Sequence, residues 1–367
     1  MKKQLIGLLV LAGIVQAVGF AAIPAKKKVS KHARTTATRK RKAAPAVDPT
    51  EGDNVDGDDL VIRRAAVAAL GSVNGSVVVV DPNTGRILTI VNQKLALKGG
   101  FTPCSTIKLV TSLAALNEHV VDRDSWVYIG RYTRFNLTTA LAKSNNQYFA
   151  TLGNRLGFQR VVKYAQLLGL GEKASLDIDA EQPGAIAAEP PKFGGVGLMT
   201  SFGEGFSVTP LELAALLSSI ANGGTLYYLQ YPRTQAELEQ FLPQVKRPLD
   251  LESNDISDIR EGMRAAVNFG TAKRAADVAD DPVLGKTGTC TDFKSSNHMG
   301  WFGSFNDVGR HQLVVVVMLT GGHNVSGPVA SGVAGSIYRS LSEQNYFASD
   351  GGPRGLPAIV STTPGAR

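Results

Sequence analysis

The chain has 367 residues, 43% of them hydrophobic, which is enough to bury one large core or two smaller ones. Its formal net charge is +8, but residues 1–47 carry eleven Lys or Arg and no acidic residue, which leaves −3 for the remainder. The basic charge therefore belongs to a tail, and because this tail follows a predicted export signal, no nucleic-acid partner is expected. Two cysteines exclude a disulfide-rich scaffold.

Residues 1–24 predict an export signal. Two lysines precede an apolar run at 5–23, whose length lies between a signal-peptide core and a membrane-spanning helix. A small-x-small cleavage site is present at Gly19-Phe20-Ala21, whereas nine basic residues between Lys26 and Lys42 disfavour passage of that flank across a membrane. The segment is either a cleaved signal peptide or an uncleaved anchor. The protein is expected in the periplasm or cell envelope, held at the inner membrane in the second case.

Two further segments are predicted to be disordered. Residues 25–59 run from a basic to an acidic block with almost no large apolar side chains, so they cannot bury enough surface to fold. The basic block suits anionic lipid or a cell-envelope polymer as partner, or it is only a solvated spacer. Residues 346–367 form a second such segment, rich in Gly, Pro, Ser and Thr.

Residues 60–345 are predicted to form the folded part. β-Rich runs are expected at 76–80, 86–91, 283–290, 299–305 and 312–319, and helices at 101–116, 137–143, 148–156, 160–168, 210–222, 255–267 and 328–342. Strands at both ends with helices between them predict one sheet built from the two termini and a second, helical lobe. A functional site is expected between the lobes.

The helix at 101–116 contains an unusual lysine. It is apolar on most sides, as a buried helix is, yet Lys108 lies within it, three residues after Ser105. At this spacing the two side chains share a helix face. A lysine desolvated among apolar neighbours loses pKa and can take the proton of a serine hydroxyl near neutrality, which makes the serine a nucleophile. In isolation, the same spacing also occurs in ordinary surface helices.

Two later motifs could complete such a site. Ser144-Asn145-Asn146 lies between two predicted helices and could present a hydroxyl that relays a proton and an amide that holds a carbonyl. The same tripeptide is also typical of an ordinary helix N-cap or turn. Lys286-Thr287-Gly288-Thr289 ends a β-rich run. Thr287 and Thr289 would point the same way and could bind a carboxylate with the nearby ammonium, while Gly288 would let a substrate backbone approach.

The three motifs in this order resemble the signature of penicillin-binding proteins and β-lactamases. The stretches "GSVVVVDPNTGRILTIVN", "VTPLELAALLSSIANGG", "GKTGT" and "WFGSF" also resemble penicillin-binding transpeptidase domains, and the likeness runs from about Gly71 to Ser342. The resemblance implies a two-lobed α/β serine D,D-peptidase fold, in which a five-stranded antiparallel sheet flanked by helices joins an all-helical lobe. Residues 60–345 would be the transpeptidase domain.

The resemblance also implies an activity, a D,D-transpeptidase that acts on peptidoglycan stem peptides ending in D-Ala-D-Ala. Ser105 would be the nucleophile and Lys108 its general base, while Ser144 and Lys286 would move the proton toward the leaving amine. Asn146, Thr287, Gly288 and Thr289 would bind substrate, and the backbone N–H groups of Ser105 and Thr289 would form the oxyanion hole. β-Lactams, as substrate mimics, would acylate Ser105. No cofactor is implied, and the five histidines show no ligand spacing, so no metal site is expected.

Three alternatives stay open at this point. If water rather than an amine accepts the acyl group, the protein is a D,D-carboxypeptidase. A β-lactamase would need a water-activating group, for which Glu204 is the formal class A candidate, or a class D pocket, which has an apolar residue where this chain has Asn146. A penicillin sensor or scaffold without turnover would keep the same motifs.

Departures from the family pattern concern the cysteines and the region before the domain. The residue before the nucleophile is commonly glycine in this family, but here it is Cys104, and Cys290 directly follows Thr289. Because the family fold sets these motifs side by side, a bridge or metal capture is conceivable, but inert packing of two thiols is the expectation. Only the short linker precedes the domain, so pairing with a glycosyltransferase is not expected. Trp126 is expected in the core.

Overall fold

The computed structural model describes residues 48–276, 282–292, 296–306, 311–322 and 324–348. The predicted signal or anchor, the basic part of the predicted linker and most of the predicted C-terminal tail lie outside these ranges. Among the described residues, no helix combines the length and the apolar character that crossing a membrane requires.

The described elements are as follows, in chain order. The helices are α1 Leu60–Leu70, α2 Gln93–Ala96, the 3-10 helix η1 Cys104–Ile107, α3 Lys108–Asn117, α4 Leu137–Lys143, α5 Asn146–Leu156, α6 Phe158–Leu167, α7 Gly195–Phe202, α8 Pro210–Ala221, α9 Gln235–Glu239, α10 Ser253–Asn268, the 3-10 helix η2 Lys273–Ala275, and α11 Gly327–Glu343. The strands are β1 Gly75–Val80, β2 Ile87–Val91, β3 Val127–Tyr128, β4 Arg134–Phe135, β5 Ala185–Ile186, β6 Phe206–Ser207, β7 Thr225–Tyr227, β8 Val245–Pro248, β9 Val283–Thr291, β10 His298–Asn306 and β11 Val314–Gly321.

One five-stranded sheet joins the two ends of the domain, as predicted. Its strand order is β2-β1-β11-β10-β9, and all neighbours are antiparallel. The N-terminal hairpin therefore pairs with the last strand, with Val77 opposite Val317. β1 is buried along its whole length, which explains its unbroken run of valines, because a strand covered on both faces needs no polar alternation. β9 lies at the edge of the sheet.

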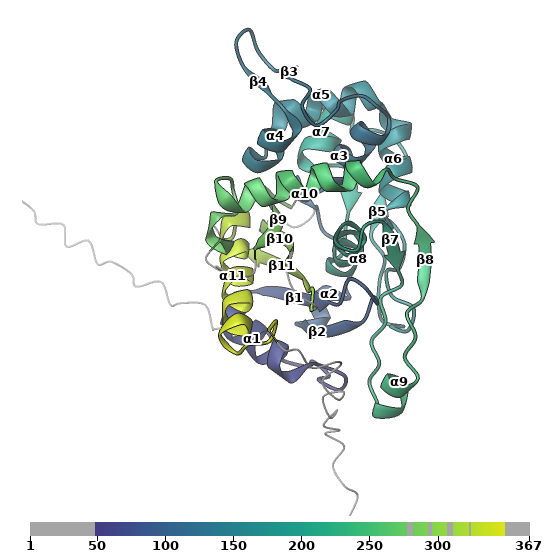
Figure 1. The fold of residues 1–367 in the computed structure, drawn as a ribbon, viewed down its shortest axis with the longest axis vertical. Coiled ribbons are helices and arrows are strands. Elements are labelled where there is room, and N and C mark those ends of the chain that lie inside the picture. The colour runs from purple at the N-terminus through teal and green to yellow at the C-terminus, as the bar shows by residue number, and fades with distance from the viewer. Residues whose placement is uncertain (1–47, 277–281, 293–295, 307–310, 323, 349–367) are drawn as a thin grey trace, which may run out of the picture. The chain divides into compact units, whose positions relative to one another are not determined.

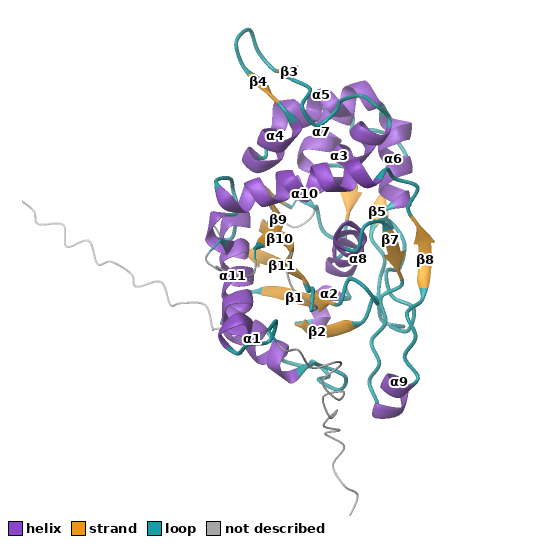
Figure 2. Cartoon of the chain, in the orientation of Figure 1, coloured by secondary structure: helices purple, strands orange, loops and turns teal. Residues whose placement is uncertain are grey.

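Helices cover both faces of this sheet (Figures 1 and 2). On one face, Val79 and Phe302 belong to a core shared with α1 and α11. On the other face, Val78, Trp301 and Phe305 belong to a larger core shared with α8 and with α3 to α7. Alternate residues of β9 therefore face either α11 or the helical lobe, and this alternation positions the candidate site residues of that strand.

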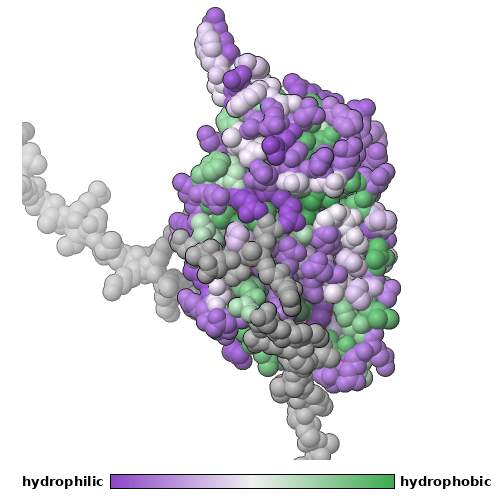
Figure 3. Space-filling model, viewed as in Figure 1, coloured by the Kyte–Doolittle hydropathy of each residue, from purple (hydrophilic) through white to green (hydrophobic). Residues whose placement is uncertain are grey.

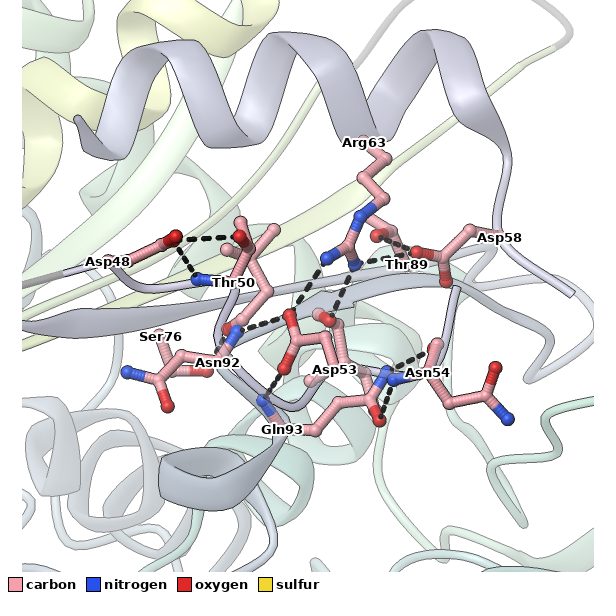
Figure 4. A network of polar contacts seen from close by, with 12 residues as sticks. Asp48, Thr50, Asp53, Asn54, Asp58, Arg63, Ser76, Thr89, Asn92 and Gln93 are labelled. Carbon is pink, nitrogen blue, oxygen red and sulfur yellow. Dashed lines mark hydrogen bonds and ion pairs between the residues drawn. The ribbon is translucent and has the colours of Figure 1, made fainter. Parts of the chain in front are cut away.

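The acidic end of the predicted linker differs from the expectation of disorder. Asp53 and Asp58 form ion pairs of 2.9 and 2.7 Å with Arg63 of α1, and their side chains are 1% and 0% exposed (Figure 4). Asp53 also accepts hydrogen bonds from the backbone N–H groups of Asn92 and Gln93. Composition did not reveal this, because the partners of these carboxylates lie in α1 and after β2.

Replacing Arg63 with alanine is expected to destabilise the domain by about 3 kcal/mol, because two buried carboxylates would lose their cation. Arg64→Ala changes the exposed neighbour on the same helix and should shift stability by less than about 0.5 kcal/mol. Urea unfolding of both variants, followed by circular dichroism, measures the difference. Equal stabilities would show that the network contributes little to folding.

Trp126 is half exposed, so the prediction that it lies in the core is wrong. It precedes β3, and the Arg134 guanidinium of β4 lies 4.4 Å from the centre of its ring. The β3–β4 hairpin projects from the helical lobe (Figures 1 and 3), and Tyr128 and Tyr132 on it are also exposed. An arginine stacked on the ring, rather than burial, accounts for the position of this tryptophan.

Candidate active site

The serine and lysine of the first motif meet at the junction of η1 and α3. Ser105 lies in the 3-10 turn, and Lys108 is the first residue of α3. In a 3-10 helix, residues three apart lie directly above one another. Ser105 Oγ and Lys108 Nζ are accordingly 2.9 Å apart. The sequence predicted this proximity from α-helical spacing, whereas the structure produces it with a tighter turn.

The second motif forms the corner between α4 and α5. Ser144 ends α4 with a φ of +52°, in the left-handed region, and Asn145 is the N-cap of α5, its side chain accepting from the Tyr148 N–H. The capping role considered for this tripeptide therefore falls to Asn145. Ser144 and Asn146, on either side of it, both reach Lys108.

Lys108 is fully buried and surrounded by oxygen atoms. Besides Ser105 Oγ, its Nζ lies 2.8 Å from the backbone oxygen of Ser144, 3.0 Å from Ser144 Oγ and 2.6 Å from Asn146 Oδ1. Burial, with the nearby charge of Lys286 as a second cause, lowers the pKa of Lys108 to about 6. Near pH 7 the amine is therefore mostly neutral, with two N–H groups and one lone pair.

The oxygen partners decide where that lone pair can act. The Ser144 carbonyl and Asn146 Oδ1 can only accept hydrogen bonds, so they take both N–H groups of the neutral amine. The lone pair is then left for a hydroxyl proton, and Ser105 Oγ lies within hydrogen-bond distance. The arrangement can remove the proton from Ser105, as a general base must.

Lys286 approaches the same corner from β9. It is fully buried, and its Nζ donates to Ser144 Oγ at 2.8 Å and to the Thr287 carbonyl at 2.9 Å. Burial lowers the pKa of Lys286 to about 7. The Ser144 hydroxyl therefore lies between two buried amines, and a proton can pass from one to the other through it.

The two threonines of the third motif lie on the opposite face of β9 from Lys286. A Cβ placed on Gly327, at the start of α11, would lie 2.8 Å from Thr287 Cβ and 3.0 Å from Thr289 Oγ1, so both threonines face that helix end. Thr289 is exposed, and its hydroxyl accepts from the Gly327 N–H at 2.8 Å. Thr287 is buried, and its hydroxyl lies 2.6 Å from that of Thr271. Sequence reasoning found neither Gly327 nor Thr271, because no short motif marks them.

Gly288 is required by packing within the protein itself. A Cβ at this position would lie 2.9 Å from the Pro103 backbone oxygen and 3.2 Å from Cys104 Cβ. The sequence suggested that Gly288 admits a substrate backbone. The structure shows that it admits η1, which brings the turn bearing Ser105 against β9.

The two cysteines form a disulfide, which corrects the expectation of two inert thiols. Cys104 and Cys290 are separated by 186 positions in the chain, and their Cα atoms are 5.5 Å apart. Cys104 has a φ of +52°, a conformation that glycine adopts readily and other residues rarely. The family resemblance placed the two motifs side by side and made a bridge conceivable, but the sequence did not show how closely the two cysteines approach.

A pH dependence follows from the buried base. The acylation rate of Ser105 should fall as the pH drops through about 6, because protonated Lys108 has no lone pair for the serine proton. Below that pH the loss should approach tenfold per unit. Stopped-flow measurement with a chromogenic penicillin between pH 5 and 8 tests this expectation. A rate independent of pH over that range would exclude Lys108 as the titrating base.

Comparison with known proteins supports the fold and the family. The family model for the penicillin binding protein transpeptidase domain matches residues 75–342. The chain is 31% identical over 292 residues to stage V sporulation protein D of Bacillus subtilis, an alignment that covers 71% of this chain and 44% of that protein. It is 26% identical over 251 residues to peptidoglycan D,D-transpeptidase FtsI of Escherichia coli K12, with 57% and 42% covered.

The chain thus spans less than half of the length of these two curated relatives. Among solved structures, the apo TP domain of Burkholderia pseudomallei penicillin-binding protein 3 is similar, with a TM-score of 0.67 at 21% identity. The match covers 79% of this chain and 96% of that one. It confirms the predicted fold class.

Proposed function

Because the chain belongs to the penicillin-binding protein transpeptidase domain family, we propose that it is a serine D,D-transpeptidase. Its substrates are peptidoglycan stem peptides that end in D-Ala-D-Ala, and its product is a cross-linked cell wall. The observation that carries the proposal is the 2.9 Å contact between Ser105 Oγ and Lys108 Nζ, with both N–H groups of the neutral amine committed elsewhere.

In the first step, Lys108 takes the hydroxyl proton while Ser105 Oγ bonds to the carbonyl carbon of the penultimate D-Ala. The negative charge that develops on the carbonyl oxygen faces the backbone N–H groups of Ser105 and Thr289. The C–N bond then breaks, and the proton passes through Ser144 and Lys286 to the nitrogen of the leaving D-Ala. An amine of a second stem peptide attacks the acyl-enzyme, and Lys108 receives its proton before returning one to Ser105.

Substrate binding is assigned to residues that surround Ser105 and the proton path through Ser144 and Lys286. Asn146 holds the peptide amide, and Thr289, the exposed threonine, binds the terminal carboxylate. Thr287 supports it through the hydroxyl pair with Thr271. The N-terminus of α11, where Gly327 donates to Thr289, adds the positive end of a helix dipole. Gly288 keeps the turn bearing Ser105 against this strand.

A β-lactamase is the second candidate function, and two observations disfavour it. Glu204 lies in the turn between α7 and β6, and within the described ranges no hydrogen bond links its carboxylate to Ser105, Lys108 or Ser144. Asn146 places an amide oxygen 2.6 Å from the base, where a class D enzyme has an apolar residue. Neither arrangement prepares a water for rapid deacylation.

The proposal extends to location and partners. The apolar N-terminal segment exports the chain to the cell envelope, where it remains as an anchor or is removed as a signal peptide. Stem peptides are the natural partners there, and β-lactams acylate Ser105 as mimics of the D-Ala-D-Ala end.

Incubating the full chain with a labelled penicillin, and separately with a pentapeptide and an acceptor amine, tests this function. We expect an adduct on Ser105 that lasts minutes or longer, release of D-Ala, and a product that contains the acceptor. Ser105→Ala should do none of these. Rapid hydrolysis and release of the penicillin would favour a β-lactamase. Hydrolysis of the pentapeptide to a tetrapeptide, without a product that contains the acceptor, would favour a carboxypeptidase. A lasting penicillin adduct without any turnover of the peptide would favour a sensor.

A further inference from the structure

The disulfide joins the two segments that carry the proposed oxyanion donors. Cys104 immediately precedes Ser105 in η1, and Cys290 immediately follows Thr289 in β9. Each half of the bridge is therefore the chain neighbour of one of the two residues whose backbone N–H groups are assigned to the oxyanion hole. Cys104 and Cys290 are 186 positions apart in the chain, so no local hydrogen-bonding pattern fixes the distance between the two N–H donors beside them.

Hydrogen bonds hold the chain on one side of this junction, and on the other side the bridge adds a covalent link where η1 packs against Gly288 of β9. Trp301 Nε1 donates to the Thr102 carbonyl at 3.0 Å, and Thr102 Oγ1 donates to Asp292 at 3.0 Å. Both contacts hold the chain before Cys104. Between Thr102 and Ser105, the disulfide at Cys104 is the covalent connection to β9.

The bridge can hold the backbone of Cys104 in an unfavourable conformation. Its φ of +52° lies in the left-handed region, which is unfavourable for a residue with a Cβ. In a thiol form, Cys104 could relax toward negative φ, and because Ser105 is the next residue, its N–H would rotate with it. Donors act on an oxyanion only at about 2.7–3.1 Å, so a small rotation is enough to lose one of them.

We propose that the Cys104–Cys290 disulfide is a positioning element of the oxyanion hole, and that a dithiol reductant switches acylation of Ser105 off by opening it. The inference rests on the function proposed above. It assigns to the bridge an effect on the acylation step, which differs from the general stabilisation that any cross-link gives.

The dithiol reductant supplies the two electrons and two protons that opening the disulfide requires. One thiolate of the dithiol attacks Sγ of Cys290, the partly exposed half of the bridge, and the Cys104 thiolate leaves; Cys104 itself is fully buried. The second thiol of the reductant then attacks the mixed disulfide and releases Cys290. The protein gains two thiols, and the dithiol becomes a cyclic disulfide. Exchange with a disulfide oxidant, which takes up the two electrons and two protons and becomes a dithiol, restores the bridge.

The test measures penicillin acylation of the full chain before and after treatment with dithiothreitol, with thiol alkylation and mass spectrometry to verify reduction. Rates at several penicillin concentrations separate the rate constant at saturation from the half-saturating concentration. We expect reduction to lower the rate constant at least tenfold and to change the half-saturating concentration less than twofold. Peptide recognition through Thr289 and Asn146 does not need the bridge.

Two double variants separate the bridge from the backbone preference at position 104. C104S/C290S removes the bridge and keeps a side chain at φ +52°, whereas C104G/C290S removes the bridge and supplies the residue best suited to that φ. C104S/C290S should acylate at the slow rate of the reduced protein, whereas C104G/C290S should recover most of the wild-type rate, because glycine adopts this φ without the bridge. Both variants should be insensitive to dithiothreitol. Melting temperatures and far-UV circular dichroism establish that each variant is folded at the assay temperature.

Three results would overturn the inference: two free thiols in the protein isolated from the cell envelope, full acylation by the reduced wild type, or equally slow acylation by C104S/C290S and C104G/C290S. The last would show that loss of the cross-link, and not the backbone conformation at position 104, slows the reaction. A failure of the proposed function looks different, because then the oxidised wild type itself would form no adduct on Ser105.

Discussion

Replacing Lys108 with methionine is expected to lower the acylation rate of Ser105 by about a thousandfold. Methionine matches the length of the lysine stem but has no lone pair to accept the serine proton, so general-base catalysis is lost. Serine would then have to react as a neutral hydroxyl, which is a poor nucleophile. The measurement is the rate constant for adduct formation with a labelled penicillin, followed by intact mass.

The same variant should melt at or above the temperature of the wild type. The pKa of Lys108 is about 6 in the folded protein, whereas an exposed lysine titrates near about 10.4. Folding at pH 7 must therefore release a proton, so this lysine opposes folding; the cost is complete below about pH 6 and disappears above about pH 10. Methionine removes it, although the Ser144 carbonyl and Asn146 lose their donor.

Lys98→Met is the control for this substitution, because Lys98 is exposed and lies before the motif. It should acylate at the wild-type rate. If Lys108→Met acylates within tenfold of wild type, Lys108 is not the general base. If the variant instead unfolds, the lysine contributes to stability, contrary to the expectation from its burial.

The sequence predicted which side chains of the candidate site lie close together because each motif is local. Ser105 and Lys108 are three residues apart, and Ser144 and Asn146 are two apart, so one turn or one corner suffices to bring each pair together. The sheet was predictable for a similar reason. Its strands are long apolar runs bounded by turn residues, and their positions at both ends of the chain fixed which segments had to pair.

Contacts between distant segments could not be predicted in the same way. The partner of Thr289 is Gly327, and that of Thr287 is Thr271; neither stands out by composition. The bridge between Cys104 and Cys290 depends on the close approach of η1 to β9, which Gly288 permits. Each of these features follows from tertiary packing, which no sequence period encodes.

Burial was the property that composition predicted least well. The acidic residues Asp53 and Asp58 are buried because Arg63 pairs with both of them, while Trp126 is exposed beside Arg134. In both cases an arginine reverses the expectation for the residue type. Polar segments can therefore belong to the folded domain when their counter-charge comes from another part of the chain.

One of the two buried lysines can accept a proton while the other donates one. Both contact Ser144 Oγ, so protonating both at once would place two positive charges around a single hydroxyl. Burial lowers the pKa of both amines, and the charge of Lys286 lowers the pKa of Lys108 further. When the pair holds a single proton on Lys286, the N–H groups of Lys108 meet the Ser144 carbonyl and Asn146, and its lone pair is left for Ser105. In the proposed mechanism Lys108 would then be the base, and Lys286 the acid, of a pair that titrates as a unit.

Replacing Lys286 with methionine should therefore lower the acylation rate by about a hundredfold. The leaving amine would lose its proton donor, and the Ser144 hydroxyl would lose the group that orients it. Removing the neighbouring positive charge should also raise the pKa of Lys108, because that charge is one cause of its depression. The acid limb of the pH–rate profile should move to higher pH in this variant.

That displacement separates a catalytic role for Lys286 from a merely structural one. A structural loss would lower the rate at every pH and leave the position of the limb unchanged. Lys273→Met provides the matched control, since Lys273 is exposed in η2 and should give the wild-type profile. If the limb of Lys286→Met stays in place while the rate falls, the two amines are not coupled through Ser144, and the division of roles between them is wrong.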